Sequence, residues 1–387
     1  MAAVEPLADP RPYGAADTAF GLDVLRAWCA SDPGQNLVFS PSTLASALGM
    51  AYLGARGSTA AAMAAVLHLP TGAGASLAAG LQARSLALSG LNGPGVTLTA
   101  SNQVWADPTL TTLRGYLDSV ATAYDAGLAQ APFSTDPGKA AAEINSAISA
   151  QTHGHITNLV SADSLAQIGW VLTSALYMDA KWVTPFHPEK TGPGTFTPDG
   201  GRAVSVPFLN GAGFPYAAAG GWQAVSLPYQ GGKLTMTALL PPTGSAGCAL
   251  PGQSTLTAVT GALRAGGEPG GTVLALPKVN LRIGGSTGDM KPVLERLGMQ
   301  TAFGETADFT GLSPQAGPIR FLQQAATLQV GERGTVGSAA AAVGVQPTAE
   351  IGGTHHVTFD RPYVLLVSAK ATGEPLFLAE VANPASS

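Results

Sequence analysis

The segment that most constrains how this chain can fold lies near the C-terminus, between residues 334 and 349. It carries no charge and almost no side chain larger than valine. A surface loop is normally polar because it faces water. A core strand normally carries large apolar side chains, because burying small ones contributes little free energy. This segment fits neither role, and it indicates a loop that can become a buried strand.

With the two-residue period of a strand, the segment has one face that could lie beneath a tight sheet. That face contains only small or β-branched side chains: Thr335, Gly337, Ala339, Ala341, Val343 and Val345. The opposite face is also small and uncharged, and the first charge after it is Glu350. The alternative is an Ala-rich helix or a flexible linker, since the chain is rich in alanine throughout.

Composition limits the function classes that are open to this chain. It has 387 residues, of which 45% are hydrophobic, so it can bury a large core. The net charge of -5 and the lack of Lys/Arg clusters argue against a nucleic-acid partner. No apolar run is long enough to cross a bilayer. No signal peptide is visible at the N-terminus, because a basic start followed by an apolar block is missing.

Two cysteines are too few to predict a disulfide framework. Cys29 lies in a helical pattern and Cys248 in a stretch rich in Gly and Pro, and we expect two separate free thiols. Residues 1–17 are polar and contain proline, and we expect them to be a disordered leader. We expect no metal or other cofactor, because the paired histidines at 153/155 and 355/356 lack any zinc-binding spacing.

Periodicity predicts helices early in the chain and strands late. The helical patterns cover residues 20–29, 43–53, 59–67, 140–156 and 290–297, and Ser42 or Thr43 is the expected cap of the second. The strand patterns cover residues 36–41, 96–105, 171–177, several short runs in 203–240, then 273–283, 319–330, 357–368 and 375–381. This order favours an α+β fold with large antiparallel sheets.

One motif could carry catalysis. Residues 284–288 match the Gly-x-Ser-x-Gly nucleophile elbow between a strand and a helix, and Asp308 or Asp360 and then His355 or His356 follow it. However, the preceding residues 278–283 alternate between polar and apolar, whereas an elbow strand is buried on both faces and continuously apolar. A hydrolase with Ser286 as its nucleophile is therefore only a minor alternative, and we expect that the protein is not an enzyme.

Several segments, taken in order, resemble the serpin family. Residues 36–43 and 53–59 resemble its second-helix signature, and residues 152–160 resemble the end of its sixth helix. Residues 172–182 resemble its central strand, and residues 332–342 are similar to the hinge of its reactive loop. Shorter matches occur at 227–229, 240–242, 276–278, 307–311 and 359–363. The resemblance covers about residues 18 to 385.

The resemblance implies a serpin fold in a single domain, residues 18–385. Its features would be a large central, mostly antiparallel sheet, two further sheets, about eight or nine helices and a mobile reactive-centre loop at about 332–353. The hinge of this loop would comprise Glu332, Gly334, Thr335, Gly337, Ala339 and Ala341. The resemblance also implies a polar cluster of Ser40, Thr43, Ser174 and Gln324 beneath the two central strands, which must separate to admit the loop. Trp182 would lie at the breach, the point where the loop first enters between these strands. The family usually has Asn at the position of Ser174 and His at that of Gln324.

The implied function is inhibition of a serine or cysteine protease by a suicide-substrate mechanism. The protease would cleave the loop and be trapped as an acyl-enzyme when the loop inserts into the central sheet. Counting from the hinge places the scissile bond at Thr348-Ala349, whereas counting back from Phe359 places it near Ile351-Gly352, with Glu350-Ile351 also open. A small residue before the bond favours an elastase-like or subtilisin-like target.

The expected partner is therefore a target protease in a covalent complex, and the inhibitor would act as a monomer. The alternative within the family is a non-inhibitory serpin that acts as a carrier or chaperone. Secretion or a periplasmic location is expected from the family role, and a cytoplasmic location stays open.

Overall fold

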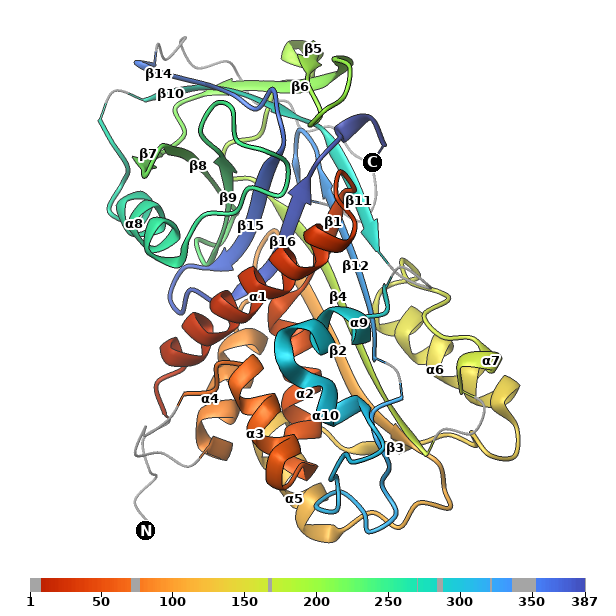
Figure 1. The fold of residues 1–387 in the computed structure, drawn as a ribbon. Helices are drawn as coiled ribbons and strands as arrows, with labels where there is room; N and C mark the ends of the chain where they lie inside the picture. The colour runs from red at the N-terminus through yellow and green to blue at the C-terminus, as the bar shows by residue number, and fades with distance from the viewer. Residues whose placement is uncertain are drawn as a thin grey trace.

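The computed structural model describes residues 8–70, 77–165, 169–269, 271–283, 288–320, 322–335 and 353–386. Within this part, three sheets and a set of helices form an α+β fold, which confirms the predicted class (Figure 1). The longer helices are α1 (Arg11–Ser31), α2 (Pro41–Gly54), α3 (Gly57–Val66), α4 (Leu77–Ser89), α5 (Arg114–Tyr124), α6 (Pro137–Gln151) and α8 (Gln253–Arg264). Single-turn helices are α7 (Ala162–Leu165), α9 (Lys291–Leu294) and α10 (Gln300–Phe303).

The central sheet has six strands in the order β11-β12-β13-β4-β2-β3. Their bounds are β11 Val279–Ile283, β12 Leu322–Val330, β13 Gly334–Thr335, β4 Trp170–Lys181, β2 Val96–Ala106 and β3 Leu128–Gln130. Most neighbours are antiparallel, but β12 runs parallel to β4, and β2 parallel to β3. This is the large, mostly antiparallel sheet that the resemblance implied.

The other two sheets lie at the opposite end of the molecule from α3 and α5 (Figure 1). One has the order β1-β16-β15-β9-β8-β7, with bounds Leu37–Phe39, Pro375–Val381, Tyr363–Ala369, Leu234–Leu240, Trp222–Pro228 and Tyr216–Ala219. The other has the order β14-β10-β6-β5, with bounds His355–Thr358, Thr272–Pro277, Val204–Ala212 and Gly192–Phe196.

Strand β4 is buried along most of its length because both of its faces are covered. Val171 and Ala175 pack with Ile144 and Ile148 of α6 in one hydrophobic cluster. The alternate residue Leu172 belongs to the larger core that contains α2. The alternation of side chains along a strand therefore gives β4 an α6 face and an α2 face.

Helix α2 begins two residues earlier than predicted. Its cap is Ser40, whose side chain accepts a hydrogen bond from the backbone N–H of Thr43, and Pro41 occupies the first turn. Proline suits this position because its missing N–H would have no partner there. The expected caps Ser42 and Thr43 instead lie inside the helix.

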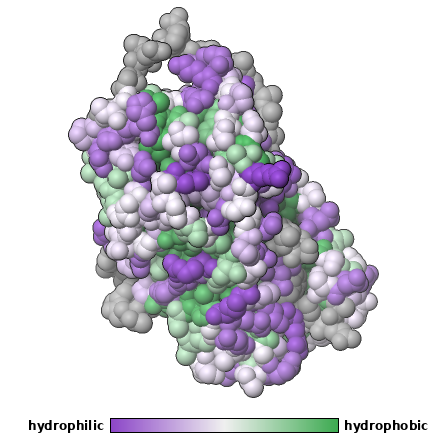
Figure 2. Space-filling view, turned by 45° about the horizontal axis from the view of Figure 1, so that its top comes forward, coloured by the Kyte–Doolittle hydropathy of each residue, from purple (hydrophilic) through white to green (hydrophobic). Residues whose placement is uncertain are grey.

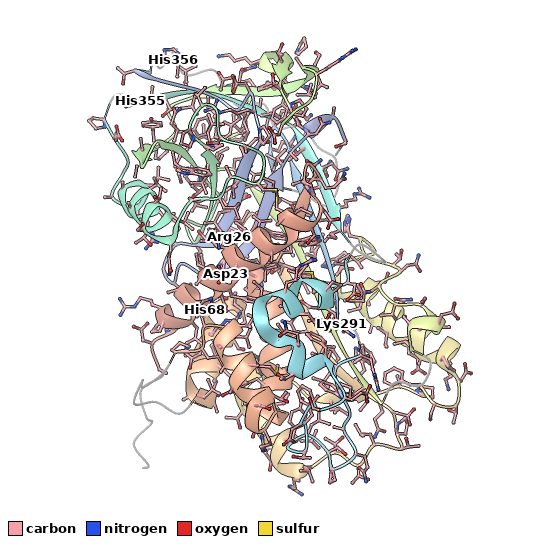
Figure 3. All side chains as sticks on the ribbon, viewed as in Figure 1. Asp23, Arg26, His68, Lys291, His355 and His356 are labelled. Atoms are coloured by element: carbon pink, nitrogen blue, oxygen red, sulfur yellow. A yellow bond between two sulfur atoms is a disulfide. The ribbon has the colours of Figure 1, made fainter. Side chains whose placement is uncertain are left out.

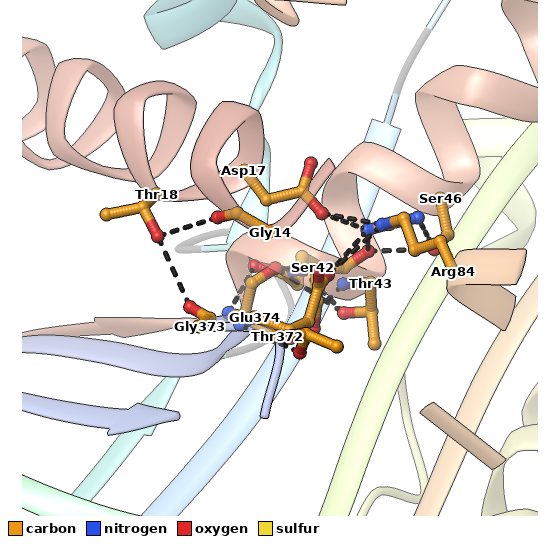
Figure 4. A network of polar contacts seen from close by, with 12 residues as sticks. Gly14, Asp17, Thr18, Ser42, Thr43, Ser46, Arg84, Thr372, Gly373 and Glu374 are labelled. Carbon is orange, nitrogen blue, oxygen red and sulfur yellow. Dashed lines mark hydrogen bonds and ion pairs between the residues drawn. The ribbon is translucent and has the colours of Figure 1, made fainter. Parts of the chain in front are cut away.

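The leader predicted for residues 1–17 is too long. Helix α1 begins at Arg11, and Asp17 is buried where its carboxylate pairs with the Arg84 guanidinium of α4 (Figure 4). Arg84 also bonds Glu374 Oε1 at 3.1 Å and Ser46 Oγ at 2.7 Å. This buried ion cluster holds the N-terminal half of α1 in place. The sequence of residues 1–17 alone could not show this, because Arg84 and Glu374 lie far away in the chain.

The prediction of two free thiols is wrong. Cys29 of α1 and Cys248, in the loop before α8, form a disulfide with their Cα atoms 5.7 Å apart. The two residues are 219 positions apart in sequence, so only the packing of that loop against α1 brings them together.

The described part has few large apolar side chains at its surface, namely Leu86, Leu113 and Val183. Figure 2 accordingly shows hydrophilic and hydrophobic residues interspersed on one face of the molecule. Among the described residues, no helix combines the length and hydropathy that a membrane span requires.

Candidate functional site: the hinge between β12 and β4

Strands β12 and β4 are joined at one end and separated at the other. Between Leu322/Leu172 and Ala326/Leu176 they pair directly and in parallel. Farther along, β13 lies between them, where Thr335 pairs with Val330 on β12 and with Ala180 on β4. Gly334 and Thr335 of the hinge thus already occupy the position of an extra strand in the central sheet.

The side chain of Thr335 is held inside the protein. It is 1% exposed, and its hydroxyl lies 2.5 Å from the Tyr229 hydroxyl. Burial raises the pKa of Tyr229 well above its usual value, so this phenol stays protonated and can take part in the hydrogen bond. The contact joins the hinge to residue 229, which is 106 positions away in sequence.

Trp182, the residue expected at the breach, packs against the same tyrosine. Its ring stacks on Tyr229 with the centroids 4.4 Å apart. Its backbone N–H donates to the carbonyl of Arg333 at 2.8 Å, and its indole Nε1–H donates to the carbonyl of Gly331 at 2.9 Å. Trp182 therefore contacts Gly331 and Arg333, at the start of the hinge, through its side chain and its backbone.

Gly334 is present because its backbone lies against β4. A Cβ added there would overlap the carbonyl oxygen of Ala180. Only a residue without a side chain allows this close approach.

Glu332 anchors the start of the hinge. Lys278 Nζ lies 2.9 and 3.0 Å from its two carboxylate oxygens, and the hydroxyl of Thr191 donates to Oε1 at 3.1 Å. Burial raises the pKa of Glu332. The hydrogen bonds that it accepts, above all the one from Lys278, outweigh this effect and hold the pKa below its ordinary value. The ion pair attaches the hinge to Lys278, between β10 and β11, and the hydrogen bond attaches it to Thr191, just before β5.

The four polar residues expected beneath the sheet do lie together. Gln324 is fully buried; its Oε1 accepts from the backbone N–H of Ser40 at 3.2 Å, and its Nε2 donates to the Ser40 carbonyl at 3.0 Å. The same nitrogen lies 3.2 Å from Thr43 Oγ1 and 3.4 Å from Ser174 Oγ. The cluster therefore connects β12, β4 and the start of α2 where the two strands still pair directly.

The remaining predicted loop residues lie outside the described residues. These are Gly337, Ala339, Ala341, the expected scissile pair Thr348 and Ala349, and the alternatives at residues 350–352. Ser286, the candidate nucleophile, also lies outside them.

The other groups of the hydrolase alternative are engaged elsewhere. His355 stacks on Tyr216 with the ring centroids 4.2 Å apart, at the edge of the four-stranded sheet (Figure 3). Asp308 Oδ1 accepts from the backbone N–H and the hydroxyl of Thr310, and Asp360 pairs with Arg361. In the part of the chain that is described, no group of three or more His, Cys, Asp or Glu side chains could hold a metal ion.

Sequence reasoning missed three side chains that hold the hinge, namely Tyr229, Lys278 and Thr191. Tyr229 and Lys278 stand in short segments that resemble the family, at 227–229 and 276–278. Those segments could mark the residues as notable, but nothing in them identifies their hinge partners.

Comparisons with known proteins agree with this geometry. A family model described as Serpin (serine protease inhibitor) matches residues 15–384. An uncharacterized serpin-like protein of Thermococcus kodakarensis is 31% identical, covering 97% of this chain and 86% of that one. The leukocyte elastase inhibitor of Bos taurus is 29% identical, covering 96% of this chain and 99% of that one.

Solved structures show the same fold. The Tenebrio molitor Serpin48 structure matches with a TM-score of 0.76 and 25% identity over 96% of this chain and 98% of that one. Human thyroxine-binding globulin in complex with thyroxine matches with a TM-score of 0.80 and 24% identity over 97% of this chain and the whole of the other. The predicted resemblance is confirmed, and the chain belongs to the serpin family of serine protease inhibitors.

Proposed function

We propose that this protein is a suicide-substrate inhibitor of serine or cysteine proteases, working by insertion of its cleaved reactive loop into the central sheet. The observation that carries the proposal is the position of Gly334 and Thr335, which already pair between β12 and β4. A segment held in this way needs only to continue between the same two strands after cleavage.

The register of β13 indicates what continued insertion would require. Extended in the same direction, residues 337, 339 and 341 would come beside Met178, Leu176 and Ser174 of β4. All three of these β4 residues are buried on the α2 face of the sheet. The loop supplies Gly, Ala and Ala at these positions, so nothing large or charged would have to enter the interior.

The inserting strand would pass through the polar cluster of Ser40, Thr43, Ser174 and Gln324. Gln324 and Ser174 are direct neighbours across the β12–β4 pair, with Nε2 and Oγ 3.4 Å apart. An inserted strand would separate them and place residue 341 between them. We infer that this cluster keeps the sheet closed until the loop is cut.

The free energy gained by inserting the loop as a new strand is large enough to drive this movement. About 15 residues at about 3.3 Å each would carry an attached protease on the order of 50 Å. At about 1 kcal/mol net for each hydrogen bond, pairing on both sides would gain on the order of 10 kcal/mol or more. The intact form would therefore persist because its conversion is slow.

We propose Thr348-Ala349 as the scissile bond and an elastase-like or subtilisin-like protease as the target. The length of the inserted strand, counted from the hinge, supports this bond. The small residue before it and the elastase inhibitors among the relatives support this target class. We also propose that residues 18–385 act as one domain and as a monomer, without a cofactor.

The test is incubation with elastase, subtilisin and trypsin, followed by denaturing electrophoresis and mass spectrometry. We expect an SDS-stable complex with elastase or subtilisin, and a released C-terminal fragment that begins at Ala349. A fragment that begins at Ile351 or Gly352 would replace the proposed bond with a later one. Cleavage by every protease without a stable complex would contradict inhibition.

The second candidate is a non-inhibitory carrier, because rat thyroxine-binding globulin is also a relative, at 29% identity. Melting of the cleaved protein separates the two candidates. Loop insertion predicts a melting temperature well above that of the intact protein, and an unchanged value together with the absence of a complex would favour the carrier.

A further inference from the structure

Two histidines flank one tyrosine on the outer face of the central sheet. Tyr177 of β4 lies two residues from Ala175 and so points to the α6 face. The rings of His153 and His155 each lie with their centroids 5.0 Å from that of Tyr177, the first tilted and the second stacked. Both histidines are exposed, whereas Tyr177 is half-buried.

A tight turn at the end of α6 presents these histidines. His153 and Gly154 both have positive φ, at 51° and 79°. The buried Thr152 closes the turn, since its carbonyl accepts from the N–H of His155 at 3.0 Å and its hydroxyl accepts from the N–H of Ile156 at 3.2 Å. The two imidazoles are therefore held against Tyr177 by a fixed backbone.

The flanked tyrosine lies where the sheet must open. Leu176 is the last residue of β4 that pairs directly with β12, and Tyr177 is the next one toward the hinge. Continuing the register of β13 would bring residue 338 beside Tyr177. Insertion would thus separate β4 from β12 at Tyr177, the residue that the two histidines contact.

One carboxylate and two cations lie on the same face of the sheet as Tyr177. On β4, Asp179 follows two residues later on the same face; burial and then this carboxylate raise the pKa of Tyr177. Lys181 lies farther along the same face at the strand end, and Arg282 faces the same side from β11. The neighbours across the sheet are uncharged: Thr97 and Thr99 on β2, and Thr327 and Gln329 on β12. The last turn of α6, residues 149–151, is also uncharged.

We propose that His153 and His155 form a pH-sensitive clamp on Tyr177 that slows strand insertion when they are protonated. Histidine is the ordinary side chain whose charge changes between about pH 5 and 8. An imidazolium against the face of Tyr177 gains a cation–π attraction and is drawn to Asp179. Repulsion between the two exposed imidazoliums is screened by water and salt. This inference rests on the proposed insertion of the loop.

The clamp can be tested without a protease, whose own activity depends on pH. A synthetic peptide of residues 335–348 would be annealed into the intact protein at pH 5.5 and pH 7.5, and its incorporation followed by the rise in melting temperature. We expect incorporation to be roughly two- to fivefold slower at pH 5.5, the factor that one exposed cation–π contact supplies. The His153→Asn/His155→Asn variant should incorporate the peptide at nearly the same rate at both pH values.

His355→Asn is the matched control, because His355 also stacks on a tyrosine but lies in another sheet. It should keep the pH ratio of the unmodified protein, and so should Tyr177→Phe, which keeps the ring. Equal rates at the two pH values in the unmodified protein, or an unchanged ratio in the double variant, would overturn the clamp while leaving insertion intact. Failure of the peptide to incorporate at either pH would overturn the insertion itself.

Discussion

Replacing Thr335 with arginine should convert the inhibitor into a substrate. Thr335 is buried between Ala180 and Val330, and its hydroxyl pairs with that of Tyr229. The new guanidinium would remain charged at any ordinary pH. At this position it would have to enter the interior or keep the hinge out of the sheet.

Two contributions set the size of the effect. Loss of the Thr335 hydroxyl leaves the buried Tyr229 hydroxyl without its partner, which costs about 1–3 kcal/mol. Burying an unpaired charge adds several kcal/mol. A combined penalty of about 4 kcal/mol in the barrier would slow insertion on the order of a thousandfold. Hydrolysis of the acyl-enzyme would then be faster than insertion.

The assay is the yield of SDS-stable complex for each loop cleaved, with the elastase-like or subtilisin-like protease that the unmodified protein traps. Val336→Arg is the matched control, because it places the same charge on the opposite face of the strand and should retain most of the complex. Thr335→Ser keeps the hydroxyl and should behave like the unmodified protein. A full yield of complex with Thr335→Arg would refute the reasoning.

Three further predictions concern interior polar groups. Gln324→Ala removes the partner of the Ser40 backbone and should lower the free energy of unfolding by about 2–3 kcal/mol in urea denaturation, with Gln324→His losing less. Arg84→Met leaves Asp17 and Glu374 buried without their cation and should cost about 3–5 kcal/mol, part of which Asp17→Asn/Glu374→Gln should restore. Burial raises the pKa of Glu380 from 4.5 to about 8, so folding favours its protonated form. Stability should therefore fall as pH rises between these values, by up to about 1.4 kcal/mol per pH unit, and Glu380→Gln should remove the fall; an equal slope in both proteins would contradict this.

Several features of this protein follow from the sequence alone, because they depend on local chemistry. The small, uncharged residues after Glu332 identify a segment able to be buried, and the two-residue period assigns Thr335 to the inward face. The strand pattern at residues 171–177 predicts the middle of β4. The ordered segments that resemble the serpin family predict the three sheets and the meeting of Ser40, Thr43, Ser174 and Gln324.

Other features were decided only by tertiary structure, because they join residues far apart in the chain. The local sequence pattern could not predict the disulfide between Cys29 and Cys248. It also could not predict that α1 begins at Arg11, where the contact of Asp17 with Arg84 holds the helix. The hydroxyl of Tyr229 likewise meets Thr335 only because two sheets bring them together. The sequence alone therefore determined which segment can become a strand, and the packing of distant elements decided where that strand begins and what holds it there.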